Sequence, residues 1–238
     1  MSESYNLNLP LIVPGQAQKH VTVNEALARL DALAQLRLVA RGLNTPPANA
    51  VDGAAYGLGA APSGAWAGQA GQIAIASNGG WSFVAPRLGW VAWDEASKGR
   101  AVFDGAAWVA DAQSLQASGA ATLGQIAEVS HVIGAGATST TAAIIPQNAV
   151  VIGVTGRVTS AITGAGLTGW RLGVAGADNR YGAGLGLGLN AYALGVTGQP
   201  QAYYAPTPLV LSGEGGSFAG GEVLLAVHYM ALQVPRAV

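Results

Sequence analysis

The alternation of apolar and polar residues divides this chain into a short helical part and a long β-rich part. From Leu27 to Leu38, leucine and alanine recur at steps of three and four residues, which is the spacing of one face of an α-helix. Thr22-Val23-Asn24-Glu25 has the pattern of an N-terminal capping box, and Gly42 followed by two prolines is typical of a helix end. The pattern predicts one helix over residues 22–41. Its leucine face needs a partner, either the next module or sister subunits.

Residues 45–112 read as short apolar runs separated by tight turns and punctuated by tryptophan. The turns contain residue pairs that tolerate the positive φ of a hairpin, at Asp52-Gly53, Asn78-Gly79-Gly80 and Asp104-Gly105. Residues 71–83 and 89–108 look like two degenerate copies of one hairpin. We therefore predict a small all-β module. Its tryptophans are predicted to fill the core rather than to form an exposed row for carbohydrate, because a module of this size needs large side chains to bury.

Residues 113–125 are small and polar and are predicted to be a linker. The remaining chain, residues 126–238, alternates short apolar runs with Gly-rich turns and shows no helical period, which is typical of an antiparallel β-sandwich or jelly roll. We predict eight strands, at residues 128–133, 140–145, 150–159, 168–175, 181–187, 191–196, 207–211 and 222–232. The last of these is too apolar for a sheet edge and is predicted to be central. The fold class is therefore mostly β with one N-terminal helix.

Composition and charge exclude several classes of protein. Only 10% of the residues are charged, the formal net charge is -1 and there is no cysteine. A basic face for nucleic acid, disulfides and thiolate chemistry are therefore not expected. No apolar stretch reaches the roughly 18 residues that span a bilayer, and the N-terminus lacks the features of a signal peptide. We expect synthesis in the cytoplasm, no membrane insertion, and release by lysis if the protein acts outside the cell.

Residues suited to catalysis are sparse. His20, His131 and His228 are isolated from one another in sequence, and no nucleophile or metal motif occurs. The segment 164–169 fits a dinucleotide fingerprint formally, but a strand rather than a helix is predicted after it. A glycosidase could use Asp178 with either Glu214 or Glu222, and this alternative stays open. We predict no enzyme activity, no catalytic residue, no cofactor and no metal site; a calcium ion at the Asp178-Asn179 turn is left undecided.

The richest mixture of aromatic and polar side chains falls in residues 126–238. Sugar rings stack on aromatic faces, and their hydroxyls pair with amide, carboxylate and guanidinium groups. We therefore predict a glycan-binding site among Trp170, Arg171, Asp178, Asn179, Arg180, Tyr181, Tyr192, Tyr203 and Tyr204. The alternative is that the rings fill the sandwich core and the charged residues form a solvated turn.

Four segments resemble an uncharacterised family of alphaproteobacterial prophages and gene transfer agents. They are Leu9 to Leu27, which joins an apolar arm with two prolines to a polar turn and the predicted helix, residues 104–108, residues 170–187 and residues 203–223. The resemblance implies a spike or fibre subunit on the head or tail of a phage-like particle. Residues 1–44 would attach to other particle proteins, and the C-terminal part would bind host surface polysaccharide.

The first hypothesis is thus a non-enzymatic adhesin on the particle surface. Because single sugar sites are weak, avidity would require several identical chains, and a homo-oligomer, most simply a trimer, is expected. A purely structural baseplate or decoration protein is the second hypothesis, and a capsule depolymerase is the third.

Overall fold

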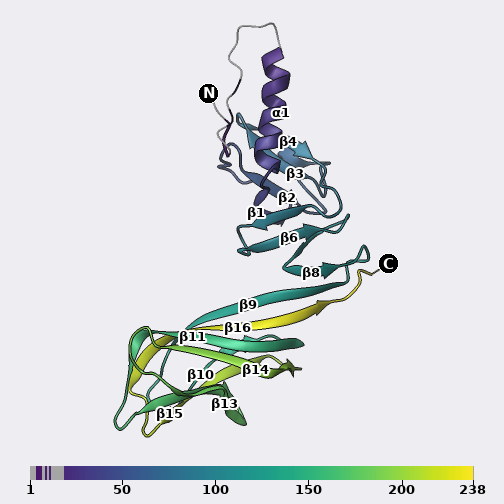
Figure 1. Ribbon diagram of the computed structural model, residues 1–238. Helices are drawn as coiled ribbons and strands as arrows, with labels where there is room; N and C mark the ends of the chain where they lie inside the picture. The colour runs from purple at the N-terminus through teal and green to yellow at the C-terminus, as the bar shows by residue number, and fades with distance from the viewer. Residues whose placement is uncertain (1–3, 7–8, 10, 12–18, 238) are drawn as a thin grey trace. The chain divides into compact units, whose positions relative to one another are not determined.

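The computed structural model describes residues 4–6, 9, 11 and 19–237, with the side chains of residues 19–22 left aside. The chain divides into two compact units, Met1–Ala120 with Pro235–Val238 and Ala121–Val234 (Figure 1). Each unit contains its own hydrophobic core. Most of the predicted proline-containing arm, including residues 12–18, lies outside the described residues.

The N-terminal helix is shorter than the sequence pattern predicts and begins earlier. Helix α1 spans Lys19–Leu33, so Thr22 lies inside it rather than at its cap, and a turn leads into strand β1 (Arg37–Leu43). The prediction of a helix over 22–41 is therefore wrong in its second half. Leu38 is fully buried, whereas Leu30 on the helix is 54% exposed. The leucine spacing predicts one helix, but Leu38 belongs to strand β1. Leu38 is buried because of neighbouring strands that are distant in sequence, not because it continues the helix face.

The first unit is built on a seven-stranded sheet in the order β4-β3-β2-β1-β5-β6-β7. Strand β1 pairs in parallel with β2 on one side and β5 on the other, while every other pair is antiparallel. The other strands of this sheet are β2 (Ala55–Leu58), β3 (Ile73–Ser77), β4 (Gly80–Val84), β5 (Val91–Asp94), β6 (Gly99–Phe103) and β7 (Trp108–Ala110), with a 3-10 turn η1 (Gly64–Trp66). Strand β8 (Ala112–Leu115) follows β7 and is not part of this sheet. Two three-stranded meanders therefore flank β1. Because residues 1–44 supply the central strand, they do not form an element separate from residues 45–112.

The three predicted hairpin turns have different outcomes. Asn78 and Gly79 both have positive φ, 50° and 72°, and close the two-residue turn between β3 and β4. Asp104 and Gly105 belong to a longer loop between β6 and β7. The hairpin predicted at Asp52-Gly53 is wrong, because this turn precedes β2, which pairs in parallel with β1.

Aromatic packing fills one side of the first unit. Trp66 is fully buried, and its ring centroid lies 5.7 Å from that of Tyr56 and 4.9 Å from that of Trp81. This agrees with the prediction that tryptophan fills the core. Trp93 is the contrary case, since it is 48% exposed.

The second unit is a jelly roll. Its strands pair antiparallel from the outside of the sequence inward: β9 with β16, β10 with β15, β11 with β14, and β12 with β13. This is one long double hairpin, which further β11–β16 and β12–β15 pairs fold into two sheets. The bounds are β9 (Ala121–Val132), β10 (Thr138–Ile145), β11 (Ala149–Thr163), β12 (Gly169–Val174), β13 (Ala177–Leu185), β14 (Tyr192–Tyr203), β15 (Thr207–Glu214) and β16 (Gly220–Gln233). All eight predicted strands are confirmed. The linker predicted over 113–125 is wrong, because β8 and β9 include most of it.

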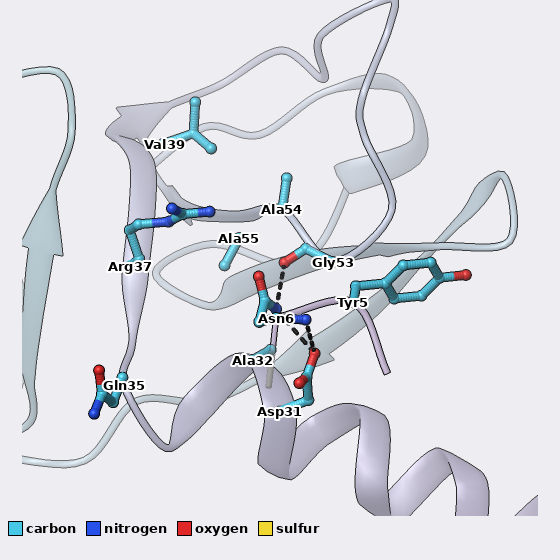
Figure 2. Close-up of a pocket in the computed structure, with 10 residues that line it drawn as sticks. All are labelled: Tyr5, Asn6, Asp31, Ala32, Gln35, Arg37, Val39, Gly53, Ala54 and Ala55. Carbon is cyan, nitrogen blue, oxygen red and sulfur yellow. Dashed lines mark hydrogen bonds between the residues drawn. The ribbon is translucent and has the colours of Figure 1, made fainter. Parts of the chain in front are cut away.

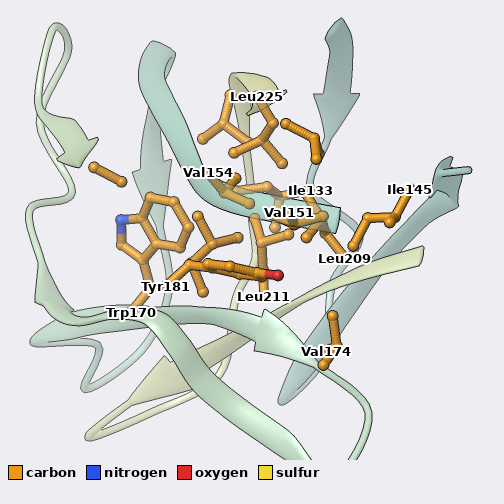
Figure 3. Close-up of a cluster of buried hydrophobic side chains, with 14 of the residues drawn as sticks. Ile133, Ile145, Val151, Val154, Trp170, Val174, Tyr181, Leu209, Leu211 and Leu225 are labelled. Atoms are coloured by element: carbon orange, nitrogen blue, oxygen red, sulfur yellow. The ribbon is translucent and has the colours of Figure 1, made fainter. Parts of the chain in front are cut away.

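The two sheets of the jelly roll enclose one apolar core. Within this unit their orders are β10-β15-β12-β13 and β14-β11-β16-β9, so β16 is central, as predicted. Figure 3 shows Trp170 and Tyr181 packed among aliphatic side chains such as Val154 and Leu211, and these four residues are all buried. Since successive side chains of a strand point to opposite faces, the residues next to these core positions face outward.

Candidate functional site

Three charged side chains meet on the outer face of the β10-β15-β12-β13 sheet. Arg171 of β12 faces outward because Trp170 and Leu172 on either side of it point into the core. Its Nη1 lies 3.2 Å from Oδ2 of Asp178 on β13, and its Nε lies 3.7 Å from Oε1 of Glu214 on β15. We call these three residues the Arg171 cluster.

A glycine opposite the third member makes room for the cluster. Gly169 is the register partner of Glu214, and a Cβ at Gly169 would lie only 2.9 Å from Oε2 of Glu214. The same Oε2 accepts a hydrogen bond from the backbone N–H of Gly184, at 3.0 Å. The carboxylate of Glu214 is thereby held beside the β12 backbone, next to Arg171.

The Arg171 cluster keeps hydrogen-bonding capacity for a ligand. The side chains of Arg171, Asp178 and Glu214 are 37%, 42% and 27% exposed. Among the described residues, Oδ1 of Asp178 accepts no hydrogen bond, and the 3.7 Å contact at Oε1 of Glu214 is too long to be one. The Nε of Arg171 is buried without a hydrogen-bond partner, so only the terminal nitrogens of the guanidinium can reach a ligand. Two carboxylate oxygens and one guanidinium therefore remain available on a rigid sheet surface, where they can pair with hydroxyl or carboxylate groups.

Three of the nine predicted glycan-binding residues are core residues, which corrects that part of the prediction. Trp170, Tyr181 and Tyr203 are 1%, 1% and 8% exposed. The indole Nε1 of Trp170 donates to the carbonyl of Gly186 at 3.0 Å, and the two tyrosine hydroxyls lie 2.6 Å apart. Burial raises the pKa of Tyr181 above its ordinary value, and the hydrogen bond to Tyr203 adds to this effect. These rings are fully engaged inside the sandwich.

The other predicted residues do not lie on one surface. Asn179 and Arg180 are exposed on β13, the strand that carries Asp178, and Nη1 of Arg180 lies 3.5 Å from the hydroxyl of Tyr203. Tyr192 is 65% exposed but belongs to β14 of the opposite sheet, and Tyr204 is 80% exposed in the connection from β14 to β15. The structure thus brings together Arg171 and Asp178, and it adds Glu214, which the sequence suggested only as half of a glycosidase pair. Gly169 leaves space for the side chain of Glu214, but the sequence alone does not show that these two residues are strand partners.

A hollow of about 400 Å³ in the first unit is the second candidate for a polar binding site, but its carboxylate, Asp31, is already hydrogen-bonded within the protein. The carboxylate of Asp31 accepts hydrogen bonds from Ser4 Oγ at 2.6 Å and from the backbone N–H and Nδ2 of Asn6 at 2.8 and 3.0 Å. Asn6 Nδ2 also donates to the carbonyl of Gly53 (Figure 2). Asp31 therefore attaches the described N-terminal residues to α1 and is a structural group.

The groups considered for catalysis are dispersed. His131 contacts Ser139 Oγ at 2.8 Å, and burial lowers its pKa; His228 contacts Thr155 Oγ1 at 3.0 Å. Glu222 is hydrogen-bonded to Ser130 on the β14-β11-β16-β9 sheet, so it is not beside Asp178. Asp178 and Glu214 do approach each other, around Arg171. The side chain of His20 lies outside the described part.

Within the described residues, no group of three or more His, Asp or Glu side chains is placed to hold a metal ion. Their one α-helix is also too short and too polar to cross a bilayer. Residues 164–169 connect β11 to β12, so a strand follows this Gly-rich turn, as predicted, rather than the helix of a dinucleotide site.

The fold and this cluster define the second unit as a jelly-roll module with a charged outer face, attached to a mixed-sheet module. Residues 23–109 of the latter match the family described as a protein of unknown function (DUF2793). The match runs from within α1 to within β7 and does not include the jelly roll. A search of curated proteins finds no match.

Among solved structures, one similar chain belongs to a structure titled "Cyanophage Pam1 capsid asymmetric unit". The similarity covers 46% of the present chain and 86% of that chain, with 21% sequence identity and a TM-score of 0.36. A TM-score this low does not establish a shared fold.

Proposed function

We propose that this protein is a non-enzymatic surface subunit of a phage-like particle and that its jelly-roll unit binds host surface polysaccharide through the Arg171 cluster. The particle context is supported by the resemblance of four segments to prophage and gene transfer agent proteins. Jelly rolls occur in viral capsid proteins and in lectins, which is compatible with both parts of the proposal. Because one fold serves many functions, the argument depends on the site.

The observation that carries the proposal is the unsaturated Arg171 cluster. The free oxygens of Asp178 and Glu214 can accept hydrogen bonds from neighbouring sugar hydroxyls, and Arg171 can donate to a sugar oxygen or pair with an acidic sugar. Asn179 and Arg180 on the same strand extend the polar surface. All these groups lie on strands, which hold them in place before the ligand arrives.

Affinity at one such site is expected to be low. The rings best placed to stack on a sugar, Trp170 and Tyr181, are inside the core, so the cluster lacks an aromatic platform. Binding to a cell would then depend on many copies displayed by one particle, whose effective concentration converts weak single contacts into firm attachment. A particle-bound protein meets this requirement.

The glycan-binding part is tested by titrating the full chain with capsular and lipopolysaccharide glycans of the host. Wild type is expected to bind at least one, and Arg171→Gln to weaken binding tenfold or more, about 1.4 kcal/mol. Arg87→Gln, an exposed arginine in the first unit, is the matched control and should bind as wild type does. Thermal unfolding of each variant separates loss of binding from loss of fold. Absence of binding by wild type, or binding that Arg171→Gln leaves unchanged, contradicts the proposed site; release of reducing ends would instead assign the depolymerase.

The particle part has its own test. Particles purified from the producing strain should contain this chain, and antibodies against it should label their surface. Particles that lack the chain would contradict a role on the particle even if glycan binding is found.

A purely structural subunit is the second candidate, and one observation favours it. Three of the five predicted aromatic contacts, Trp170, Tyr181 and Tyr203, serve the core of the jelly roll instead of a surface. This candidate expects the chain in particles and no affinity for any host glycan.

A further inference from the structure

The outer face of the β14-β11-β16-β9 sheet is unusually apolar. Six large side chains on it are exposed, each by 40% or more: Tyr192 65%, Leu194 67%, Val196 74%, Ile152 43%, Leu224 40% and Ile126 60%. We call these six residues the apolar face. They belong to all four strands, so the surface extends across the whole sheet.

Strand register places these side chains in adjacent rows. The pairings form three rungs across the sheet: Tyr192–Arg157–Leu224–Ser130, Leu194–Thr155–Ala226–Glu128 and Val196–Gly153–His228–Ile126. The intervening positions of β16, such as Val223 and Leu225, are fully buried in the sandwich, so the rung residues of that strand point away from the core. Tyr192, Leu194 and Val196 therefore form one row along β14, and Arg157, Thr155, Gly153 and His228 lie between this row and Leu224 or Ile126.

The amount of apolar surface is large for a face in contact with water alone. The six side chains together expose on the order of 700 Å², which is near one partner's share of a stable interface. The sequence agrees, because residues 222–232 are apolar at almost every position instead of alternating. A continuous apolar run is typical of a strand that is covered on both faces.

Charges on the same face indicate what covers it. Arg157 and Glu128 both border a hollow of about 290 Å³ in the apolar face. Arg157 donates to the carbonyl of Asn190 at 2.9 Å and lies over the ring of Tyr192, with 5.8 Å between its Cζ and the ring centroid. Neither Arg157 nor Glu128 forms an ion pair with any described residue.

The two charges are arranged to complement a copy of the same surface. They lie on β11 and β9, on neighbouring rungs and roughly 10 Å apart across the sheet, and they do not pair with each other. In a closed assembly of copies around a symmetry axis, the arginine of one copy can meet the glutamate of another, and every such pair occurs once per copy. A different partner would have to supply both charges at the same spacing.

We propose that the apolar face is the contact between copies of this chain in a closed homo-oligomer, with Arg157 of one copy paired to Glu128 of the next. This surface is on the opposite sheet from the Arg171 cluster, so self-association and glycan binding are independent. The mass of the assembly gives the number of copies, for which a trimer is the expectation from avidity.

The test measures the mass of the full chain in solution, by light scattering or sedimentation, over a wide range of concentration. Wild type is expected to be an oligomer of constant mass. Leu194→Asp places a charge in the middle of the β14 row of the apolar face and should give monomer. The control Leu88→Asp, at a site 69% exposed in the first unit, should leave the mass unchanged.

Exchange of the two charges keeps the test decisive if Leu194→Asp fails to fold. Arg157→Glu and Glu128→Arg should each raise the dissociation constant tenfold or more, and the double variant should restore it towards the wild-type value. A monomeric wild type overturns the proposal, and so does an oligomer that neither charge reversal weakens. If wild type is monomeric and Leu194→Asp loses glycan binding, the apolar face binds a ligand instead of another copy. This outcome also overturns the proposal.

Discussion

Arg236 donates a hydrogen bond to the carboxylate of Asp104, a residue that precedes it by 132 positions in the chain. The side chain of Asp104 is fully buried, and its Oδ1 also accepts the backbone N–H groups of Ala106 and Ala107 at 2.9 and 2.8 Å. Arg236 donates further to the carbonyl of Ala117, at 2.6 Å. The chain leaves the first unit at Ala120 and returns at Pro235, so this ion pair fastens the returning segment.

Removal of the Asp104 carboxylate should destabilise the first unit. Asp104→Ala deprives two backbone N–H groups and one guanidinium of their acceptor, and we expect a loss of about 2–3 kcal/mol in unfolding free energy. Asp104→Asn keeps an acceptor for the two N–H groups and should lose less. Chemical denaturation measures both. Equal losses in the two variants would mean that the backbone contacts contribute little.

The same carboxylate should make stability depend on pH. Burial alone would raise the pKa of Asp104, but the hydrogen bonds from Ala107 and Ala106 and the charge of Arg236 outweigh burial and lower the pKa below its usual value. A lowered pKa means that the contribution is complete above the pKa of the unfolded chain, about 3.9, and disappears as the pH falls through the lower folded-state value.

Wild type should therefore lose more stability than Asp104→Asn between about pH 5 and pH 2. His131, whose pKa burial lowers, is present in both proteins, so its effect cancels in the difference. Thermal unfolding of the two proteins over this range is the measurement, and parallel curves would contradict the assignment.

Loss of the Asp31 carboxylate should release the described N-terminal residues from α1. Asp31 lies near the C-terminal end of the helix, where a carboxylate is unfavourable, and hydrogen bonds from Ser4 and Asn6 compensate it. In Asp31→Ala, the amides of Ser4, Asn6 and Leu9 should exchange hydrogen tenfold faster or more, while the core strands stay protected. Glu25→Ala, at an exposed position of the same helix, is the control. Unchanged exchange would show that other contacts hold these residues.

Truncation of Trp170 should destabilise the jelly roll, and the loss of stability should be the same with and without glycan. Trp170→Ala leaves a large cavity in a tightly packed core and should cost about 3–5 kcal/mol. Trp170→Phe keeps most of the apolar volume but leaves the carbonyl of Gly186 without its donor, and should cost about 1–3 kcal/mol. Trp93→Phe, at an exposed position, should be nearly neutral. A neutral Trp170→Ala would return this ring to the candidates for ligand binding.

The jelly roll could be predicted from sequence because its signals are local. Each of its eight strands overlaps one of the apolar runs predicted between Gly-rich turns, although the pattern does not indicate which strands pair. The end of α1 could not be predicted in this way. Residues 34–41 fit both a helical and an extended pattern, and β1 is extended because β2 and β5 bond to its two edges. Their hydrogen bonds come from residues that the local pattern does not include.

From the sequence alone it follows that Trp170 and Arg171 had to separate. Both lie in the predicted strand 168–175, and adjacent side chains of a strand point to opposite faces. One of the two therefore had to face the core. Only the packing of the two sheets settled that Trp170, Tyr181 and Tyr203 fill that core and that Glu214 lies beside Arg171. The same packing leaves the apolar face uncovered within the jelly-roll unit, because it determines which of the two faces of each strand is enclosed.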